Sequence, residues 1–154
     1  MITIELSTLI DRPMPEVFAF LSNPLNLSQW QAMVAHIEQV TPGNPQVGTK
    51  YKVSAEVMGR KIDGLMEITA LEPPAKFAFI NRAGPMQVNI VVTLKPVGSG
   101  TKISLYAEGN PGGVFAFAEG ILAHKVKSEM ETNLARLKSV LESTSESSSE
   151  SNVS

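Results

Sequence analysis

Hydrophobic and polar residues alternate along much of the chain with a period of two, which is the pattern of half-buried strands. In residues 2–10, Ile2, Ile4 and Leu6 alternate with Thr3 and Glu5. Further runs of this kind occupy residues 50–57, 61–68, 77–82, 86–95 and 102–108, and residues 34–40 are also predicted as a strand. Turn-forming stretches rich in glycine and proline separate most of them. Successive short strands with tight turns predict an antiparallel sheet of about seven strands, with one face buried and one face in solvent.

Two short helices are predicted directly after the first strand, in the stretch RPMPEVFAFLSNPLNLSQW at residues 12–30. Proline suits the first turn of a helix because its fixed φ is helical and its missing N–H would be unpaired there. We therefore expect a helix that begins near Pro15. The Asn23-Pro24 pair ends it, because the residue before a proline disfavours the α region. A second short turn of helix should then end at Trp30.

A long helix is predicted over residues 114–142, which contain no proline. At about 100° per residue, Leu122, Val126 and Leu137 gather on one side of it. This apolar side is the natural cover for the apolar face of the sheet. Asn133 falls in the middle of the same side, and a buried amide needs hydrogen-bond partners. Either it bonds to the sheet or it faces a pocket and orients a polar group of a ligand.

The last residues, 143–154, read STSESSSESNVS and include a single apolar side chain. Such a segment cannot bury enough apolar surface to offset the entropy lost on ordering. We expect it to be disordered. Residues 1–142 are then one domain.

Five phrases of the sequence, in this order along the chain, resemble the START-like helix-grip (SRPBCC) superfamily and its polyketide cyclase/dehydrase family. They are IDRPMPEVFAFLSNPLNLSQW, VGTKYKV, ITALEPPAKFAF, VTLKPVGSGTKISLYAEG and LARLKSVLE. The resemblance implies an α+β helix-grip fold, in which a curved antiparallel sheet wraps around a long C-terminal helix. It also implies an apolar cavity between sheet and helix, in agreement with the difficulty of filling a curved sheet by side chains alone.

The cavity-lining candidates are the inward positions of the predicted strands and helix, together with the only tryptophan. They are Trp30, Tyr51, Val53, Ala55, Met66, Phe79, Asn81, Met86, Val88, Ile90, Leu105, Leu122, Val126, Met130 and Asn133. Trp30 either stacks on a ligand or packs in the core. Tyr51, Asn81 and Asn133 are the candidates for polar contacts.

The composition of the chain limits the classes of partner and site that we expect. The net charge of −2 argues against a nucleic-acid partner, since nothing basic enough to follow phosphates is present. The chain has no cysteine, which excludes disulfides and zinc–thiolate sites. No apolar run approaches the ~20 residues of a membrane span, and the N-terminus does not resemble a signal peptide. We expect a cytoplasmic monomer or weak dimer that binds a small hydrophobic or amphipathic molecule, without a metal or another cofactor.

Three functions are compatible with this fold. The first is a carrier or sensor that binds its ligand in the cavity. The second is a polyketide cyclase- or aromatase-like enzyme, which needs inward acid–base groups. The third is a co-chaperone-like or assembly protein that uses the apolar segment 114–123. Almost every charged strand residue is predicted to point outward, and His124 is predicted in solvent. His36 is predicted as a surface or hydrogen-bonded histidine, with a general base as the alternative. This pattern favours binding over catalysis, and no catalytic residue is identified.

Overall fold

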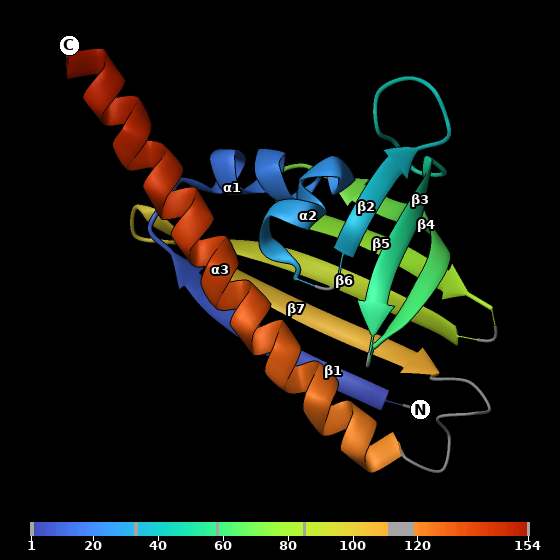
Figure 1. Ribbon diagram of the computed structural model, residues 1–154. Helices are drawn as coiled ribbons and strands as arrows, with labels where there is room; N and C mark the ends of the chain where they lie inside the picture. The colour runs from blue at the N-terminus through green and yellow to red at the C-terminus, as the bar shows by residue number, and fades with distance from the viewer. Residues whose placement is uncertain (1, 33, 58, 85, 111–118, 154) are drawn as a thin grey trace.

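The computed structural model describes residues 2–32, 34–57, 59–84, 86–110 and 119–153 (Figure 1). Seven strands form one antiparallel sheet in the order β1-β7-β6-β5-β4-β3-β2. The strands are β1 (Ile2–Ile10), β2 (Val34–Gln39), β3 (Lys50–Val57), β4 (Arg60–Glu72), β5 (Lys76–Ala83), β6 (Met86–Val97) and β7 (Gly100–Asn110). The helices are α1 (Met14–Leu21), the single 3-10 turn η1 (Pro24–Asn26), α2 (Leu27–Trp30) and α3 (Glu119–Val153). The predicted fold class is confirmed.

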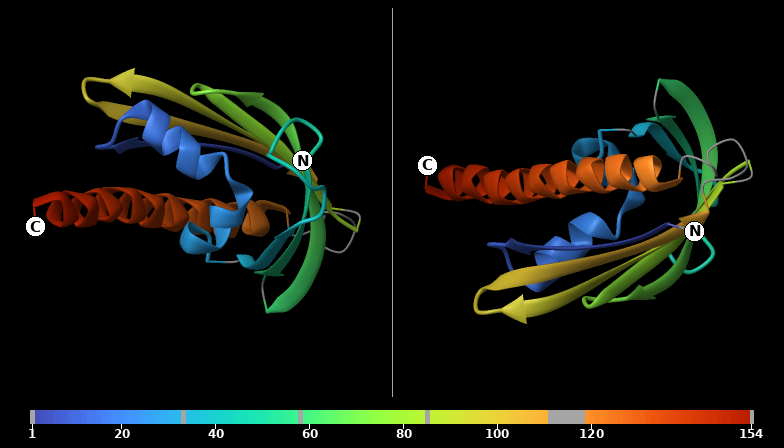
Figure 2. Two further views of the ribbon diagram at one scale, coloured as in Figure 1. Left: turned by 90° about the horizontal axis from the view of Figure 1, so that it is seen from above. Right: turned by 90° about the horizontal axis from the view of Figure 1, so that it is seen from below.

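The sheet is curved, and Figure 2 shows it bending around one end of α3. Each strand from β3 to β7 pairs with the strand before it in the sequence, and β1 returns to the edge beside β7. Residues opposite each other across antiparallel strands share a face. Tyr51, Met66, Asn81 and Val88 are opposite one another in this way and therefore all belong to the concave face.

The helices α1, η1 and α2 have the boundaries that their prolines favour. Pro13 is the N-cap of α1 in an extended conformation, and a further proline lies in the first turn. The backbone N–H of Ser22 donates to Phe18 O at 2.8 Å and closes the helix. The side chain of Asn23 then accepts from the backbone N–H of Leu25 at 3.2 Å and starts η1. These elements line the upper edge of the sheet in Figure 1, next to α3.

The long helix α3 packs along β1 and against α2. Polar contacts hold it to the free edge of β1. Lys138 donates its Nζ proton to the carbonyl of Leu9 at 2.6 Å, and the Glu142 carboxylate accepts from the backbone N–H of Asp11 at 3.1 Å. Lys138 and Glu142 are also an ion pair at 3.0 Å. These contacts supply partners for backbone groups that an edge strand leaves unpaired.

Two predictions about the C-terminal third concern the ends of α3. The sequence predicts a helix from residue 114, and residues 114–118 lie outside the described part of the chain. At its other end α3 continues to Val153 and so includes most of the Ser/Glu-rich segment. The expected disorder of residues 143–154 in solution stays a prediction.

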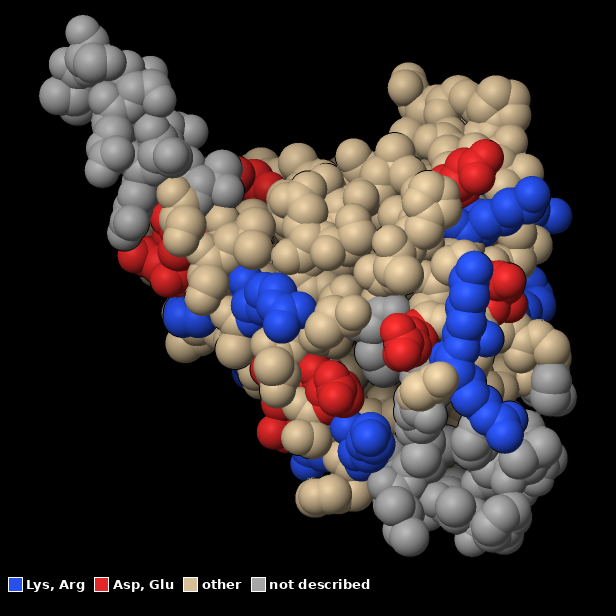
Figure 3. Space-filling model, viewed as in Figure 1, with Lys and Arg blue, Asp and Glu red and all other residues tan. Residues whose placement is uncertain are grey.

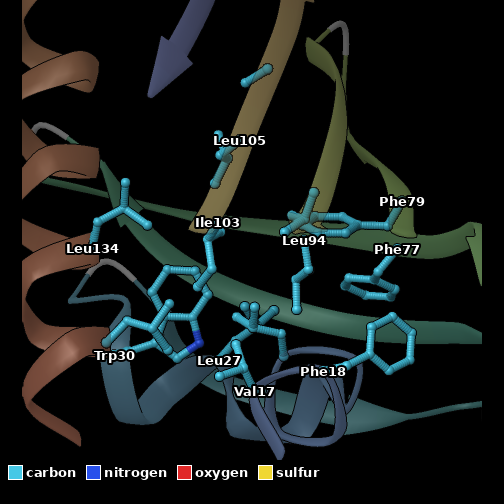
Figure 4. Close-up of a cluster of buried hydrophobic side chains, with 14 of the residues drawn as sticks. Val17, Phe18, Leu27, Trp30, Phe77, Phe79, Leu94, Ile103, Leu105 and Leu134 are labelled. Carbon is cyan, nitrogen blue, oxygen red and sulfur yellow. The ribbon is translucent and has the colours of Figure 1, made fainter. Parts of the chain in front are cut away.

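A dense cluster of apolar side chains occupies one end of the space between the sheet and the helices. Figure 4 shows Val17 and Phe18 of α1 on the helix side of this cluster, with Leu94 and Ile103 on the sheet side. Leu137 of α3 belongs to the same cluster and is completely buried. We call this region the filled end. It consists of Ile10, Val17, Phe18, Ile68, Leu94, Ile103, Leu137 and Leu141.

Candidate ligand-binding cavity

A cavity of about 260 Å³ lies between the concave face of the sheet, α2 and α3. It begins where the filled end stops, and we call this region the hollow end. Strands β1 and β3–β7, the start of β2, the helices α1 and α2 and one side of α3 all contribute to its wall. The lining residues are Ile2, Ile4, Leu21, Leu27, Trp30, Gln31, Val34, Val53, Ala55, Ile62, Gly64, Phe77, Phe79, Asn81, Ala83, Met86, Val88, Ile90, Val92, Leu105, Ala107, Gly109, Val126, Met130 and Asn133.

The wall of the cavity is almost entirely hydrocarbon. None of the described lining residues is an acid, a base or a tyrosine. Its polar side chains are the amides of Gln31, Asn81 and Asn133, together with the indole N–H of Trp30. The arrangement can therefore hold an apolar molecule and offer it a few neutral hydrogen bonds.

The three amide side chains differ in whether their hydrogen-bonding groups have partners within the protein. Asn133 is 2% exposed, and its Oδ1 accepts a hydrogen bond from the backbone N–H of Ala32 at 3.2 Å. Its amino group has no partner among the described residues. The side chains of Gln31 and Asn81 make no hydrogen bond within the described part of the chain. Asn133 therefore lies in the cavity wall, as one alternative predicted. Its hydrogen-bond partner follows α2 and does not belong to the sheet, and its contact with a ligand stays a prediction.

Small residues keep the hollow end open. Ala55, Ala83 and Ala107 lie on the strands of its wall, together with two glycines. A Cβ atom at Gly64 would approach the carbonyl oxygen of Arg82 to 2.9 Å, and one at Gly109 would approach Val88 Cγ2 to the same distance. A larger residue at either position would force its neighbour to move. The glycines thus allow close strand contact without side chains that project into the space.

The structure places most of the sequence-predicted candidates around this cavity. Those in its wall are Trp30, Val53, Ala55, Phe79, Asn81, Met86, Val88, Ile90, Leu105, Val126, Met130 and Asn133. Trp30 is also part of the buried core, where Figure 4 shows it beside Leu27 and near α3. The side chain of Leu122 lies outside the described part of the structure. Ligand contact by any of these residues stays a prediction.

Tyr51 and Met66 differ from the expectation. Both are on the concave face and completely buried, but neither lines the cavity. The Tyr51 hydroxyl has no hydrogen-bond partner among the described residues, and burial raises the pKa of this hydroxyl above its ordinary value of 10.0. The period of two gave the correct face for both residues. It could not show that other side chains cover them.

Several lining residues were not among the candidates. Ile62, Gly64 and Ala107 continue the inward phase of predicted strands, so the alternation itself could have included them. Gln31 carries no such signal, because it follows α2 in an irregular segment. Only the placement of α2 against α3 brings its amide to the wall.

The ionisable side chains that the structure describes lie away from the cavity. The side chains of Lys52, Lys61 and Arg82 are exposed, as the alternation predicted. His36 is 69% exposed and lies 3.9 Å from a carboxylate oxygen of Glu38, so its surface position is confirmed. The exposed position of His124 is confirmed as well. In Figure 3, acidic and basic side chains are interspersed on the visible face.

The described residues show neither a metal-binding cluster nor a membrane-spanning helix. They contain no group of three or more histidine or acidic side chains that could hold a metal ion. None of the helices, over the part of the chain described, is both long and apolar enough to cross a membrane.

A curved antiparallel sheet around a C-terminal helix, with an apolar cavity between them, defines a helix-grip protein. Comparison with known families identifies the family to which the chain belongs. Residues 1–142 match the family model described as polyketide cyclase/dehydrase and lipid transport. The chain belongs to this family. No curated protein matches the chain.

Solved structures support the same fold at low sequence identity. The protein TTHA0849 from Thermus thermophilus is 19% identical with a TM-score of 0.78, over 93% of this chain and 99% of that one. The aromatase/cyclase Zhui from Streptomyces sp. R1128 is 14% identical with a TM-score of 0.75, over 91% and 93%. Ara h 8.0201 is 17% identical with a TM-score of 0.69, over 92% and 97%.

Proposed function

We propose that this protein binds a small hydrophobic or amphipathic molecule in the cavity, as a carrier or a sensor. The observation that supports this proposal is the hollow end, about 260 Å³ in volume, with no ionisable side chain among its described lining residues. Burial of apolar ligand surface would supply most of the affinity. The few neutral amides would orient the ligand.

The volume limits the size of the ligand. An apolar cavity of about 150 Å³ is enough to bind benzene, and ligand sites commonly range from about 300 to 1,000 Å³. The present cavity, at about 260 Å³, is near the lower limit of that range. A molecule with one or two rings, or a short acyl chain, matches this volume.

An enzyme of the polyketide cyclase or aromatase kind is the second candidate. The family of the chain and its similarity in fold to the aromatase/cyclase Zhui favour it. Proton transfer in such a reaction needs an acid or base within hydrogen-bond reach of the substrate. The described wall offers amides and an indole instead, so we prefer binding to catalysis. An interaction protein that uses residues 114–123 remains a third expectation, and those side chains lie outside the described part.

The proposal is tested by native mass spectrometry of the protein purified from its host. We expect an additional mass that corresponds to a retained small molecule. A cavity-filling variant, Ala107→Phe, should lose this mass, because Ala107 lies in the wall and the new ring would occupy the space.

Ser104→Phe is the matched control, because Ser104 is on the same strand and is half-exposed outside the cavity. It should retain the additional mass. An empty wild-type protein, or a mass retained equally by Ala107→Phe, would contradict the proposal. A cytoplasmic location and a monomeric or weakly dimeric state remain further predictions.

A further inference from the structure

We infer that the cavity selects uncharged ligands carrying a neutral hydrogen-bonding group, such as an amide, a carbonyl or a hydroxyl, and rejects carboxylates of the same size. This inference rests on the proposed function and specifies the class of ligand. It follows from the charge and the hydrogen-bonding groups of the cavity wall.

The cavity wall offers no partner for an anionic ligand among its described residues. No described lining residue carries a positive charge that could pair with an anion. The exposed strand cations have other environments: Arg82, for example, lies 3.8 Å from the carboxylate of Glu67, outside the cavity. Among residues 1–142, the structure leaves one ionisable side chain undescribed, that of Glu119. It is an acid and cannot supply a positive charge. A carboxylate in this cavity would lose its hydration without gaining a partner, which is strongly unfavourable.

The amides of the wall offer hydrogen bonds to a neutral ligand. Gln31 and Asn81 both line the cavity, and neither side chain has a hydrogen-bond partner in the described part of the chain. The free amino group of Asn133 adds a donor. Each amide can donate and accept, so together they match neutral groups of either kind. A pure hydrocarbon would displace water from these amides and leave them unpaired.

The amides lie on two walls of the cavity. Asn81 belongs to β5 in the sheet, whereas Gln31 and Asn133 belong to the end of α2 and to α3. Aromatic and aliphatic side chains, including Phe77, Phe79 and Ile90, make up most of the surface between them. A ligand with an apolar body and a neutral polar group can satisfy both parts of this wall.

Three probes that share one naphthalene ring system separate charge from hydrogen bonding. They are naphthalene, naphthamide and naphthoate, the last two substituted at the same ring position. Amide and carboxylate have almost the same shape, and the carboxylate is ionised at neutral pH because ordinary carboxyl pKa values are about 4. Their dissociation constants are measured by isothermal titration calorimetry at pH 7 on the full chain, freed of any retained ligand.

Naphthamide should bind at least about tenfold more tightly than naphthoate, since desolvating an unpaired charge is the larger penalty. It should also bind about threefold or more tightly than naphthalene, because it supplies partners for the amides. Equal affinities, or a preference for naphthoate, would overturn the inference and leave the proposed function intact. If none of the three probes bound, the proposed function would fail as well.

A variant of one lining amide tests whether the cavity wall causes the preference for naphthamide. Asn81→Leu should reduce the affinity for naphthamide about threefold or more and leave that for naphthalene equal or higher. Asn89→Leu is the control, because Asn89 is exposed on β6 and lies outside the cavity. It should change neither affinity. An unchanged preference in Asn81→Leu, with the same result in Gln31→Leu, would contradict the role of the amides.

Discussion

The filled end and the hollow end of this protein lie on the same sheet, yet they differ in what covers them. At the filled end, α1 contributes Val17 and Phe18, and the facing positions of the sheet carry Leu94 and Ile103. At the hollow end, alanines and glycines alternate with larger residues, and α3 contributes Val126 and Met130. The comparison indicates that one end of the sheet is packed by side chains, whereas the other end encloses the space in which the proposed ligand would bind.

Close packing explains why the two ends should respond differently to mutation. Side chains in a filled core lose both transfer energy and contacts when they are truncated, because the surroundings relax only partly. A side chain in a cavity wall already borders empty space on one side. It therefore has fewer contacts to lose.

The largest expected effect comes from two isoleucines on neighbouring strands. Ile103, on β7 at the filled end, is 1% exposed, whereas Ile90, on β6, lines the cavity. Ile103→Ala should lower the free energy of unfolding by about 3 to 5 kcal/mol. Ile90→Ala should lower it by only about 1 to 2 kcal/mol, since less packing is lost. Denaturant unfolding measures both values, and equal losses would show that the two ends do not differ in this way.

A smaller effect should separate the two asparagines of the hollow end. Asn133→Leu would leave the backbone N–H of Ala32 without its acceptor. The free energy of unfolding should fall by about 1 to 3 kcal/mol as a result. Asn81 has no hydrogen-bond partner among the described residues. Asn81→Leu should therefore change the free energy of unfolding by less than about 0.5 kcal/mol. Thermal and denaturant unfolding of both variants provide the test, and a similar loss in each would contradict the assignment.

The smallest effect concerns pH and the contacts that hold α3 to β1 beside the filled end. The hydrogen bond from the Asp11 N–H, followed by that from Lys138, holds the pKa of Glu142 below its ordinary value of 4.5. A carboxylate whose pKa is lower in the folded state stabilises the fold above its unfolded pKa, and this contribution is lost as the pH falls through the folded value.

In Glu142→Gln, the melting temperature should therefore fall slightly less steeply as the pH drops below about 4.5. The pH dependence of the melting temperature near neutral pH should be unchanged. Melting temperatures measured from pH 7 to low pH, compared with those of the wild type, check this expectation. Glu131→Gln, an exposed substitution on the same helix, serves as the control. An identical pH dependence in wild type and Glu142→Gln would exclude the proposed contribution.

The pattern of the sequence was sufficient for the elements and for their faces. A period of two placed Phe79 and Asn81 inside and Arg82 outside, because successive side chains of a strand point to opposite faces. The helical spacing likewise placed Val126 and Asn133 on the side of α3 that meets the sheet. The order of these elements, together with the resemblance of five phrases to one superfamily, was enough to predict the fold.

Only the tertiary structure decided which inward residues fill the core and which surround a space. Tyr51 and Val53 are two positions apart on one strand and share a face, yet the first is covered and the second lines the cavity. Similarly, the hydrogen bond of Asn133 joins residues 101 positions apart. Alternation predicts the direction in which a side chain points, whereas its burial depends on where the helices pack against the sheet. That position depends on contacts between distant segments, which no local pattern contains.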